Sequence, residues 1–136
     1  MKLDLLGLDH VVLSCRDLKT MATFYCDVLG CTMDRWREEL GLVHLRAGNA
    51  FIDLADAEKA RTRRGGDEPT DVAAPNMDHF CLNVGKVDAA ALSAYLAERG
   101  VQAAAPVMRY GATGDRLSIY LNDPEGNSVE LRAELS

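Results

Sequence analysis

The sequence predicts an α+β fold that contains two copies of one βαβββ module. Two strand-like segments, residues 8–13 and 77–82, each contain an Asp-His pair, and a helical stretch after each segment ends at Gly30 or Gly100. The second histidine follows the first by 69 positions, and Gly100 follows Gly30 by 70. Two different features repeat at nearly the same interval, so we interpret the chain as a duplication.

The first module is predicted from one helix and four short strand patterns. Apolar residues at helical spacing indicate a helix over residues 17–29, with Asp17 as a possible N-cap and Gly30 as the stop; these residues are Met21, Phe24, Tyr25, Val28 and Leu29. Alternating apolar runs predict the strands, which we place at residues 8–15, 31–38, 41–47 and 50–55.

The second module follows the same order. A helix is predicted over residues 88–99, with Leu92, Tyr95 and Leu96 on its apolar side and Gly100 at its end. Residues 123–127, Asp-Pro-Glu-Gly-Asn, are typical of a tight turn that leads into the last strand. The predicted strands cover residues 77–84, 101–108, 117–122 and 128–133.

The domain organisation follows from the duplication. A chain of 136 residues is long enough for one compact domain with its own core. We predict a single domain over residues 1–136, with the first module at 5–56 and the second at 77–134. Between them, residues 57–76 are rich in charge and glycine and are interpreted as a linker or mobile flap.

Composition narrows the function classes. The net charge of −6 and the pI near 5.0 argue against a nucleic-acid or anionic-membrane partner, and a small molecule is the expected ligand. There is no apolar run of about 20 residues and no signal-peptide pattern, so a cytoplasmic protein is expected. Four cysteines without C-x-x-C spacing predict neither a disulfide framework nor a zinc ribbon.

Two histidines and two acidic residues occupy equivalent positions in the two modules, and together they predict a metal site. His10 and His79 interrupt the first strand of each module, and Asp53 and Glu130 interrupt the last. A charged carboxylate in a half-buried strand is costly unless something compensates it. A lone His or Glu on a strand is usually satisfied by hydrogen bonds or by solvent. The repetition of two imidazoles and two carboxylates favours ligands of one divalent metal over four separate satisfied groups.

At this point the motifs resemble a known family. There are three such motifs: Leu-Asp-His before Phe24-Tyr25-x-x-Val28-Leu29-Gly30, Met-Asp-His-Phe, and Asp123-Pro124-x-Gly126-Asn127-x-x-Glu130-Leu131. Together they are similar to the motifs of the vicinal oxygen chelate superfamily. This superfamily includes glyoxalases, bleomycin-resistance proteins and extradiol dioxygenases. The resemblance covers almost the whole chain and implies paired modules that curl into a cupped mixed sheet around one metal.

The resemblance also implies a ligand set and a reaction. His10, His79 and Glu130 match positions where most metal-dependent members have ligands, and Asp53 matches a Glu of glyoxalase I. Such a ligand set implies that the metal is Ni, Zn, Co, Mn or Fe. It also implies an enzyme of the lyase and isomerase branch, similar to lactoylglutathione lyase. In that branch a metal polarises a carbonyl of a vicinal-oxygen substrate, a carboxylate removes the neighbouring proton, and the metal stabilises the enediolate. Glu130 is the candidate catalytic base.

Three alternatives to a lyase or isomerase stay open, and the first two depend on whether Asp53 binds the metal. Asp53 is one methylene shorter than Glu, so it reaches the metal directly, through water, or not at all. Without it, His10, His79 and Glu130 form a facial triad that suits an extradiol-type dioxygenase or a fosfomycin-resistance-like thiol transferase. A metal-free drug-binding protein of the bleomycin-resistance type is the third alternative. Family members commonly form homodimers, so a homodimer is expected.

Four further residues are candidate substrate contacts. His44 lies mid-strand, where it lines the site or faces solvent. Ser118 and Tyr120 share one face of a strand, and a tyrosine hydroxyl there suits a substrate oxygen, although most strand tyrosines only pack. Arg109 begins a glycine-containing loop that suits either a clamp on an anionic substrate or a plain solvated loop.

Overall fold

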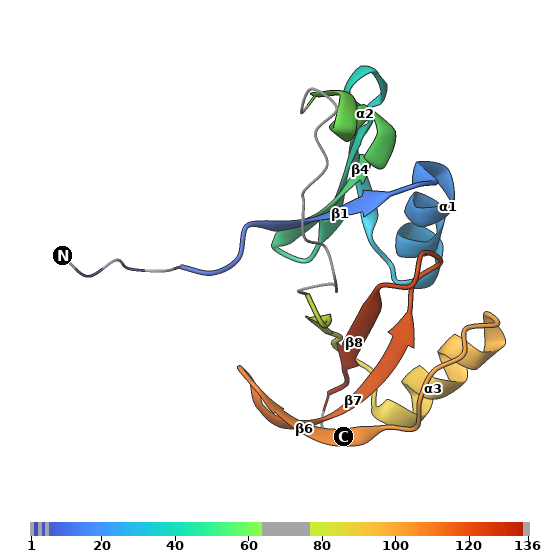
Figure 1. Cartoon of the computed structure of the whole chain (residues 1–136). Coiled ribbons are helices and arrows are strands. Elements are labelled where there is room, and N and C mark those ends of the chain that lie inside the picture. The colour runs from blue at the N-terminus through green and yellow to red at the C-terminus, as the bar shows by residue number, and fades with distance from the viewer. Residues whose placement is uncertain (1, 3, 5, 64–76, 135–136) are drawn as a thin grey trace. The chain divides into compact units, whose positions relative to one another are not determined.

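The computed structural model describes residues 2, 4, 6–63 and 77–134 of the 136. The chain divides into two compact units, Met1–Thr70 and Asp71–Ser136. Each unit contains one mixed four-stranded sheet and a helix after its first strand (Figure 1). The order βαβββ therefore occurs twice, which confirms the predicted α+β fold and the duplicated module.

The sheet of the first unit has the strand order β1-β4-β3-β2. β1 runs parallel to β4, and the two remaining pairs, β4 with β3 and β3 with β2, are antiparallel. The 3-10 turn Glu38–Leu40 joins β2 to β3. The strands are β1 (His10–Cys15), β2 (Thr32–Arg37), β3 (Leu42–Ala47) and β4 (Ala50–Asp56).

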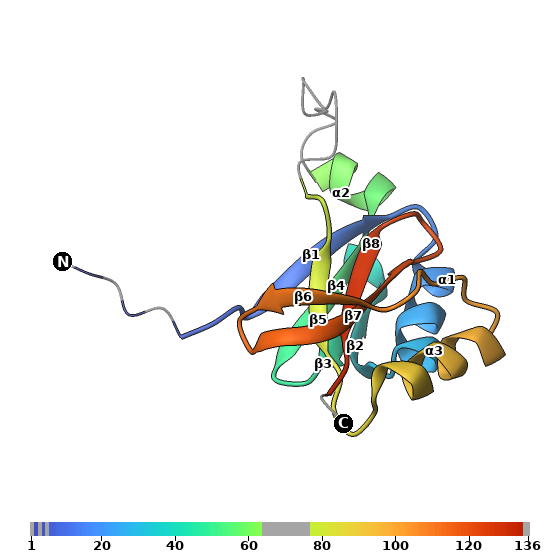
Figure 2. The same ribbon diagram turned by 90° about the horizontal axis from the view of Figure 1, so that it is seen from below.

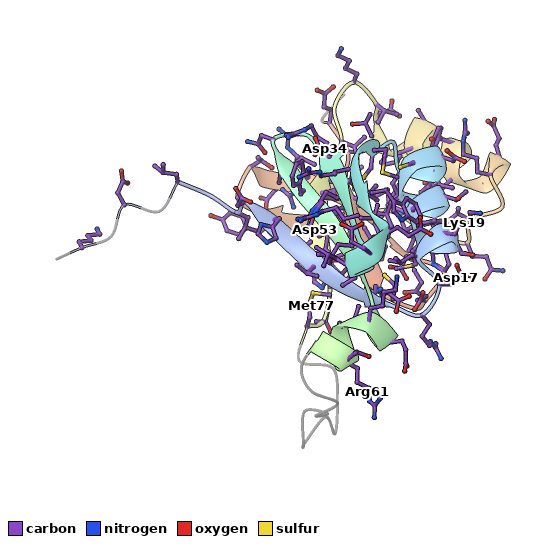
Figure 3. All side chains as sticks on the ribbon, turned by 90° about the horizontal axis from the view of Figure 1, so that it is seen from above. Asp17, Lys19, Asp34, Asp53, Arg61 and Met77 are labelled. Carbon is purple, nitrogen blue, oxygen red and sulfur yellow. The ribbon has the colours of Figure 1, made fainter. Side chains whose placement is uncertain are left out.

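The predicted helix over residues 17–29 is formed from two parts. The α-helix α1 (Leu18–Thr23) begins at Asp17, whose carboxylate accepts a hydrogen bond from the Thr20 amide at 3.0 Å. The chain then widens into a π-helical turn, Phe24–Val28, and stops at Gly30, where φ is 86°. Figure 3 labels Asp17 at the start of this helix. The predicted capping residue and stop residue are both confirmed.

The second unit repeats this arrangement with the strand order β5-β8-β7-β6. β5 is parallel to β8, and the β8-β7 and β7-β6 pairs are antiparallel. Helix α3 (Ala89–Glu98) follows β5, is capped by the Asp88 carboxylate and ends before Gly100 (Figure 2). The strands are β5 (Phe80–Asn83), β6 (Val107–Gly111), β7 (Gly114–Asn122) and β8 (Ser128–Arg132).

Two expectations about local structure were wrong. Residues 57–63, assigned to the linker, form helix α2 (Ala57–Arg63), whose first turn is capped when the Lys59 amide donates to Asp56. The rest of the linker, residues 64–76, lies outside the described residues. The strand expected at 101–108 begins only at Val107, because Pro106 lacks an amide donor and the preceding stretch makes a single bridge, Ala103 to Leu121.

No helix in the described part of the chain is long and apolar enough to cross a membrane.

Each sheet has one face whose apolar side chains are buried in its unit. In the first unit, Leu54 is aligned with Leu13 and Val43, and these three buried side chains share a face with the neighbouring buried residues Leu45 and Ile52. In the second unit, the corresponding buried face is formed by Ile119, Leu121, Val129 and Leu131. The opposite side, which we call the open face, carries the polar residues of the candidate site.

Candidate functional site

The sheet register places the predicted ligands on the open faces. Glu130 lies in the middle of β8, aligned with Tyr120 of β7 and with Cys81 of β5. The predicted turn before β8 is confirmed, because the Asp123 carboxylate accepts hydrogen bonds from the amides of Glu125 and Asn127. Gly126 there has a φ of 86°. This turn fixes where β8 begins and therefore which way Glu130 points.

Glu130 is the centre of a group of four side chains in the second unit. Its Oε1 lies 3.0 Å from His79 Nε2 and accepts a hydrogen bond from the Tyr120 hydroxyl at 2.9 Å. Its Oε2 accepts a hydrogen bond from the Ser118 hydroxyl at 2.7 Å. The His79 and Tyr120 rings also meet edge to face, with centroids 5.5 Å apart. Four of the residues predicted from sequence therefore lie together, because His79, Ser118 and Tyr120 all contact the Glu130 carboxylate.

These contacts keep Glu130 ionised despite its burial. Burial alone disfavours the charged carboxylate, but hydrogen bonds from Ser118 and Tyr120 and the nearby His79 outweigh it, so the pKa of Glu130 is below its ordinary value. Desolvation and the hydrogen bond to Glu130 together raise the pKa of the Tyr120 hydroxyl. The carboxylate is thus the proton acceptor of the group, and the tyrosine is a donor.

Each predicted histidine is oriented by the aspartate before it. His79 Nδ1 lies 2.7 Å from the Asp78 carboxylate, and His10 Nδ1 lies 2.7 Å from that of Asp9. A hydrogen bond from Nδ1–H to a carboxylate leaves Nε2 of a neutral imidazole with a free lone pair. A carboxylate that accepts the Nδ1–H in this way fixes the orientation of the ring, and metal-binding histidines commonly have such a partner. Both Asp-His pairs are visible in the sequence, but the predicted site did not include the aspartates.

Replacing Asp78 with Asn is expected to lower the pKa of His79 in the metal-free protein. The Asp78 hydrogen bond is the largest cause that raises this pKa above 6.5. A raised folded-state pKa stabilises the fold below about pH 6.5, and the benefit is lost as the pH rises through the folded-state pKa. NMR titration of the His79 ring measures the change. Asp9→Asn is the matched control and should shift only His10; an unchanged His79 titration in Asp78→Asn would contradict the assignment.

The first unit holds the other two predicted ligands, His10 and Asp53. The buried Asp53 carboxylate lies in β4 on the open face (Figure 3), with its Oδ1 2.9 Å from Nδ1 of His44 in β3. His44 is aligned with Asp53 as Tyr120 is aligned with Glu130. The exposed His10 has a raised pKa, caused first by its hydrogen bond to Asp9 and further by the charge of Asp53. One Asp53 oxygen is therefore already engaged within its own unit.

Three further residues near Glu130 complete the description. Arg109 extends from β6 toward Tyr120, with its guanidinium carbon 6.0 Å from the ring centroid. Arg132, two positions after Glu130 in β8, is buried, and its Nη1 lies 3.9 Å from Glu130 Oε2. Cys81 is an exposed residue, and desolvation of its thiol and the charge of Glu130 raise its pKa to about 12. None of the four cysteines forms a disulfide within the described residues.

The donor chemistry of the His79–Glu130 pair fits a divalent cation. With Nδ1 bonded to Asp78, the Nε2 lone pair faces the Oε1 lone pairs at 3.0 Å, so a proton or a cation must lie between them. Two ligands at right angles on an octahedral ion, each about 2.1 Å from it, are also about 3.0 Å apart. Within the described residues, no three His, Cys, Asp or Glu side chains are grouped closely enough to hold a metal.

Comparison with known proteins places the chain in a family. It is 29% identical over 133 residues to glyoxalase domain-containing protein RDO1 of Mycosarcoma maydis, covering 96% of this chain and 69% of that protein. It is 30% identical over 125 residues to virulence protein STM3117 of Salmonella typhimurium, covering 91% of this chain and 81% of that protein. The crystal structure of STM3117 matches with a TM-score of 0.75 over 99% of this chain and 100% of that one, at 26% identity.

A third comparison concerns the fold alone. The crystal structure of lactoylglutathione lyase from Agrobacterium tumefaciens has a TM-score of 0.68 and 23% identity, covering 94% of this chain and 93% of that one.

The model of one family, Glyoxalase/Bleomycin resistance protein/Dioxygenase superfamily, matches residues 7–131, which include every candidate ligand described above. The chain therefore belongs to the glyoxalase, bleomycin resistance protein and dioxygenase superfamily.

Proposed function

We propose that this protein is a divalent-metal-dependent enzyme of the glyoxalase type, a lyase or isomerase that acts on a small substrate with neighbouring oxygen atoms. The proposed ligands are His79 and Glu130, with His10 and Asp53 as further donors, since two protein ligands are fewer than catalytic metal sites commonly use. The native ion is drawn from Ni, Zn, Co, Mn and Fe.

The observation that carries the proposal is the contact between His79 Nε2 and Glu130 Oε1 at 3.0 Å. With Nδ1–H bonded to Asp78, the neutral form of His79 directs its Nε2 lone pair at a carboxylate that is kept ionised by two hydroxyl donors. A purely structural pair would need a shared proton, whereas a metal-binding pair needs none. Membership of a superfamily with many metal-dependent enzymes supports the second interpretation.

The chain's own residues supply a base and a proton donor. When bound, the metal would polarise a substrate carbonyl and so acidify the neighbouring C–H. Glu130 is the proposed base, and its hydrogen bonds from Ser118 and Tyr120 weaken its basicity while the site is empty of substrate. If a substrate oxygen takes over the Tyr120 hydroxyl, Glu130 loses one donor and becomes a stronger base.

A second candidate function rests on Asp53. Its Oδ1 lies 2.9 Å from His44 Nδ1, so a contact within the same unit competes with metal ligation by this oxygen. A site without Asp53 has two histidines and one carboxylate, which suits iron and dioxygen chemistry or thiol transfer. The second candidate is therefore an extradiol-type dioxygenase or a fosfomycin-resistance-like thiol transferase.

Metal reconstitution with a substrate screen tests both proposals. Protein stripped with chelator receives Ni, Zn, Co, Mn or Fe(II) singly and is assayed on a hemithioacetal, a catechol, and fosfomycin with a thiol. We expect metal-dependent turnover of the hemithioacetal; turnover of the catechol or of fosfomycin would instead establish the second candidate. Stoichiometric Co(II) binding should be lost in His79→Ala.

The matched control for the ligand variants is Asp115→Asn. Asp115 is an exposed carboxylate of β7 that is aligned with Tyr110, so it points to the face opposite Ser118 and Tyr120. This variant should bind Co(II) as the wild type does. Protein that binds none of the five ions, or whose affinity for Co(II) is the same in His79→Ala, would refute the metal site.

A further inference from the structure

Arg132 fixes the β6–β7 hairpin through buried hydrogen bonds. Its side chain crosses the open face from β8, and only 4% of the residue is exposed. Nη1 donates to the carbonyl oxygen of Arg109 at 3.2 Å, and Nη2 donates to Thr113 Oγ1 at 3.3 Å and to the carbonyl of Gly114. One guanidinium thus binds both strands of the hairpin and the turn between them. In the sheet, β7 lies between β8 and β6 (Figure 2).

The hairpin is shaped to admit this guanidinium. A Cβ atom on Gly111 would lie 2.7 Å from both Cζ and Nη1 of Arg132, closer than such atoms approach. Because Gly111 has no side chain, the β6 backbone lies directly against the planar group. Since the Arg109 carbonyl accepts from the same guanidinium, Arg132 adds to the β6–β7 pairing in holding the backbone from which the Arg109 side chain begins.

Arg109 carries a positive charge to the edge of the His79–Glu130 group. Its exposed guanidinium lies 6.0 Å from the centre of the Tyr120 ring, whose hydroxyl donates to Glu130. Its Nη1 donates to the carbonyl of Met108 at 3.0 Å, and no carboxylate within the described residues forms an ion pair with it. The cation beside the proposed reaction centre therefore has capacity to bind an anion.

The surrounding charges also indicate a missing acceptor. Arg109 is aligned across the strands with Arg116, and like charges directly opposite one another destabilise a sheet. Among the described residues, the buried Nε–H groups of Arg116 and Arg132 have no hydrogen-bond acceptor. In the second sheet, Glu130 is the one carboxylate on the open face of the described strands, and it is already bonded to Ser118 and Tyr120. An oxyanion would relieve the repulsion and supply acceptors.

We propose that the substrate carries an oxyanion, a carboxylate or a phosphate, that Arg109 binds, and that Arg132 is the positioning residue that holds Arg109 beside Tyr120. This inference rests on the proposed function and deepens it by naming the substrate class. It requires no covalent step. It predicts that the second unit binds a simple oxyanion even when no metal is present.

Titration of chelator-treated protein with inorganic phosphate and with acetate tests the oxyanion site. The arginine Nε–H signals in NMR spectra report binding at each guanidinium. In the wild type, at least one probe should shift the Arg109 and Arg116 signals saturably, and the stronger probe identifies the anion. Arg109→Met should weaken that binding at least tenfold. Arg99→Met, which removes an arginine stacked on Tyr95 of α3, is the matched control and should leave it unchanged.

Arg132→Lys tests the positioning role, because lysine keeps the charge but lacks the fork that binds Arg109, Thr113 and Gly114. We expect the loss of oxyanion affinity seen in Arg109→Met, with a folded methyl spectrum. Thr113→Val leaves the Arg132 charge intact, removes one acceptor and should cause a smaller loss; it serves if Arg132→Lys does not fold.

The possible results separate this inference from the metal proposal. Wild-type affinity in Arg132→Lys or, if that variant does not fold, in Thr113→Val would overturn the positioning role. Wild-type affinity in Arg109→Met, or no saturable shift with either probe, would overturn the oxyanion site. Because the titrations use metal-free protein, failure of metal binding leaves their outcome unaffected.

Discussion

Glu130→Gln is expected to reduce turnover by roughly 10²–10⁴-fold, the range typical for loss of a positioned general base. The amide has nearly the same shape as the carboxylate but neither its charge nor its basicity. Its NH2 group would also face one of the two hydroxyls, Ser118 or Tyr120, that now donate to the carboxylate. The measurement is kcat on whichever of the three screened compounds the wild type converts, with the native ion present in excess.

A carboxylate elsewhere in the same unit provides the control for this prediction. Glu98 is an exposed residue at the end of α3 whose side chain lies 4.0 Å from Arg99. Glu98→Gln should retain wild-type kcat. If Glu130→Gln also retained it, Glu130 would be excluded as the base, and proton abstraction would have to be assigned to another group.

Leu54→Ala is expected to lower the free energy of unfolding by about 2–5 kcal/mol, the usual cost of truncating a fully buried leucine. Leu54 is 0% exposed on β4, aligned with Leu13 of the parallel strand β1 and Val43 of the antiparallel strand β3. Its removal would leave a cavity where three strands meet. Urea unfolding followed by circular dichroism measures the change.

The control for Leu54→Ala is a truncation on the other face of the same sheet. Val12 lies one strand away on β1, aligned with Asp53, and is 55% exposed. Val12→Ala should change the free energy of unfolding by less than about 0.5 kcal/mol. Equal destabilisation by the two variants would mean that the two faces of the first sheet are not distinct.

The fold was largely predictable because the sequence repeats its local signals. Asp17 and Gly30 set the ends of the first helix as expected, and the alternating strands gave the order of elements. The errors arose where tertiary contacts outweigh composition. Residues 57–63 are highly charged, yet helix α2 packs on β4 and is capped by Asp56. The widening of the helix at 24–28 left no signal in apolar spacing.

The candidate site was predictable in its residues but not in its connections. Strand alternation predicts which residues of the same strand share a face with Glu130 or with Tyr120. Only the β7–β8 register shows that these two residues are aligned across neighbouring strands. His44 was left between two interpretations, and the structure pairs it with Asp53. Arg132 was missed, although it shares a face with Glu130, because its role depends on a hairpin that strand patterns do not describe.

Each sheet is built from strands of one half of the chain, and this affects when the sheet can form during synthesis. Every strand of the first sheet precedes residue 57, and every strand of the second follows residue 79, so neither sheet waits for a segment from the other half. Chains are synthesised from the N-terminus at about 5–20 residues per second, and early segments can fold before later ones are made. The hydrogen bonds of the first sheet can therefore form on the ribosome several seconds before synthesis of the second is complete.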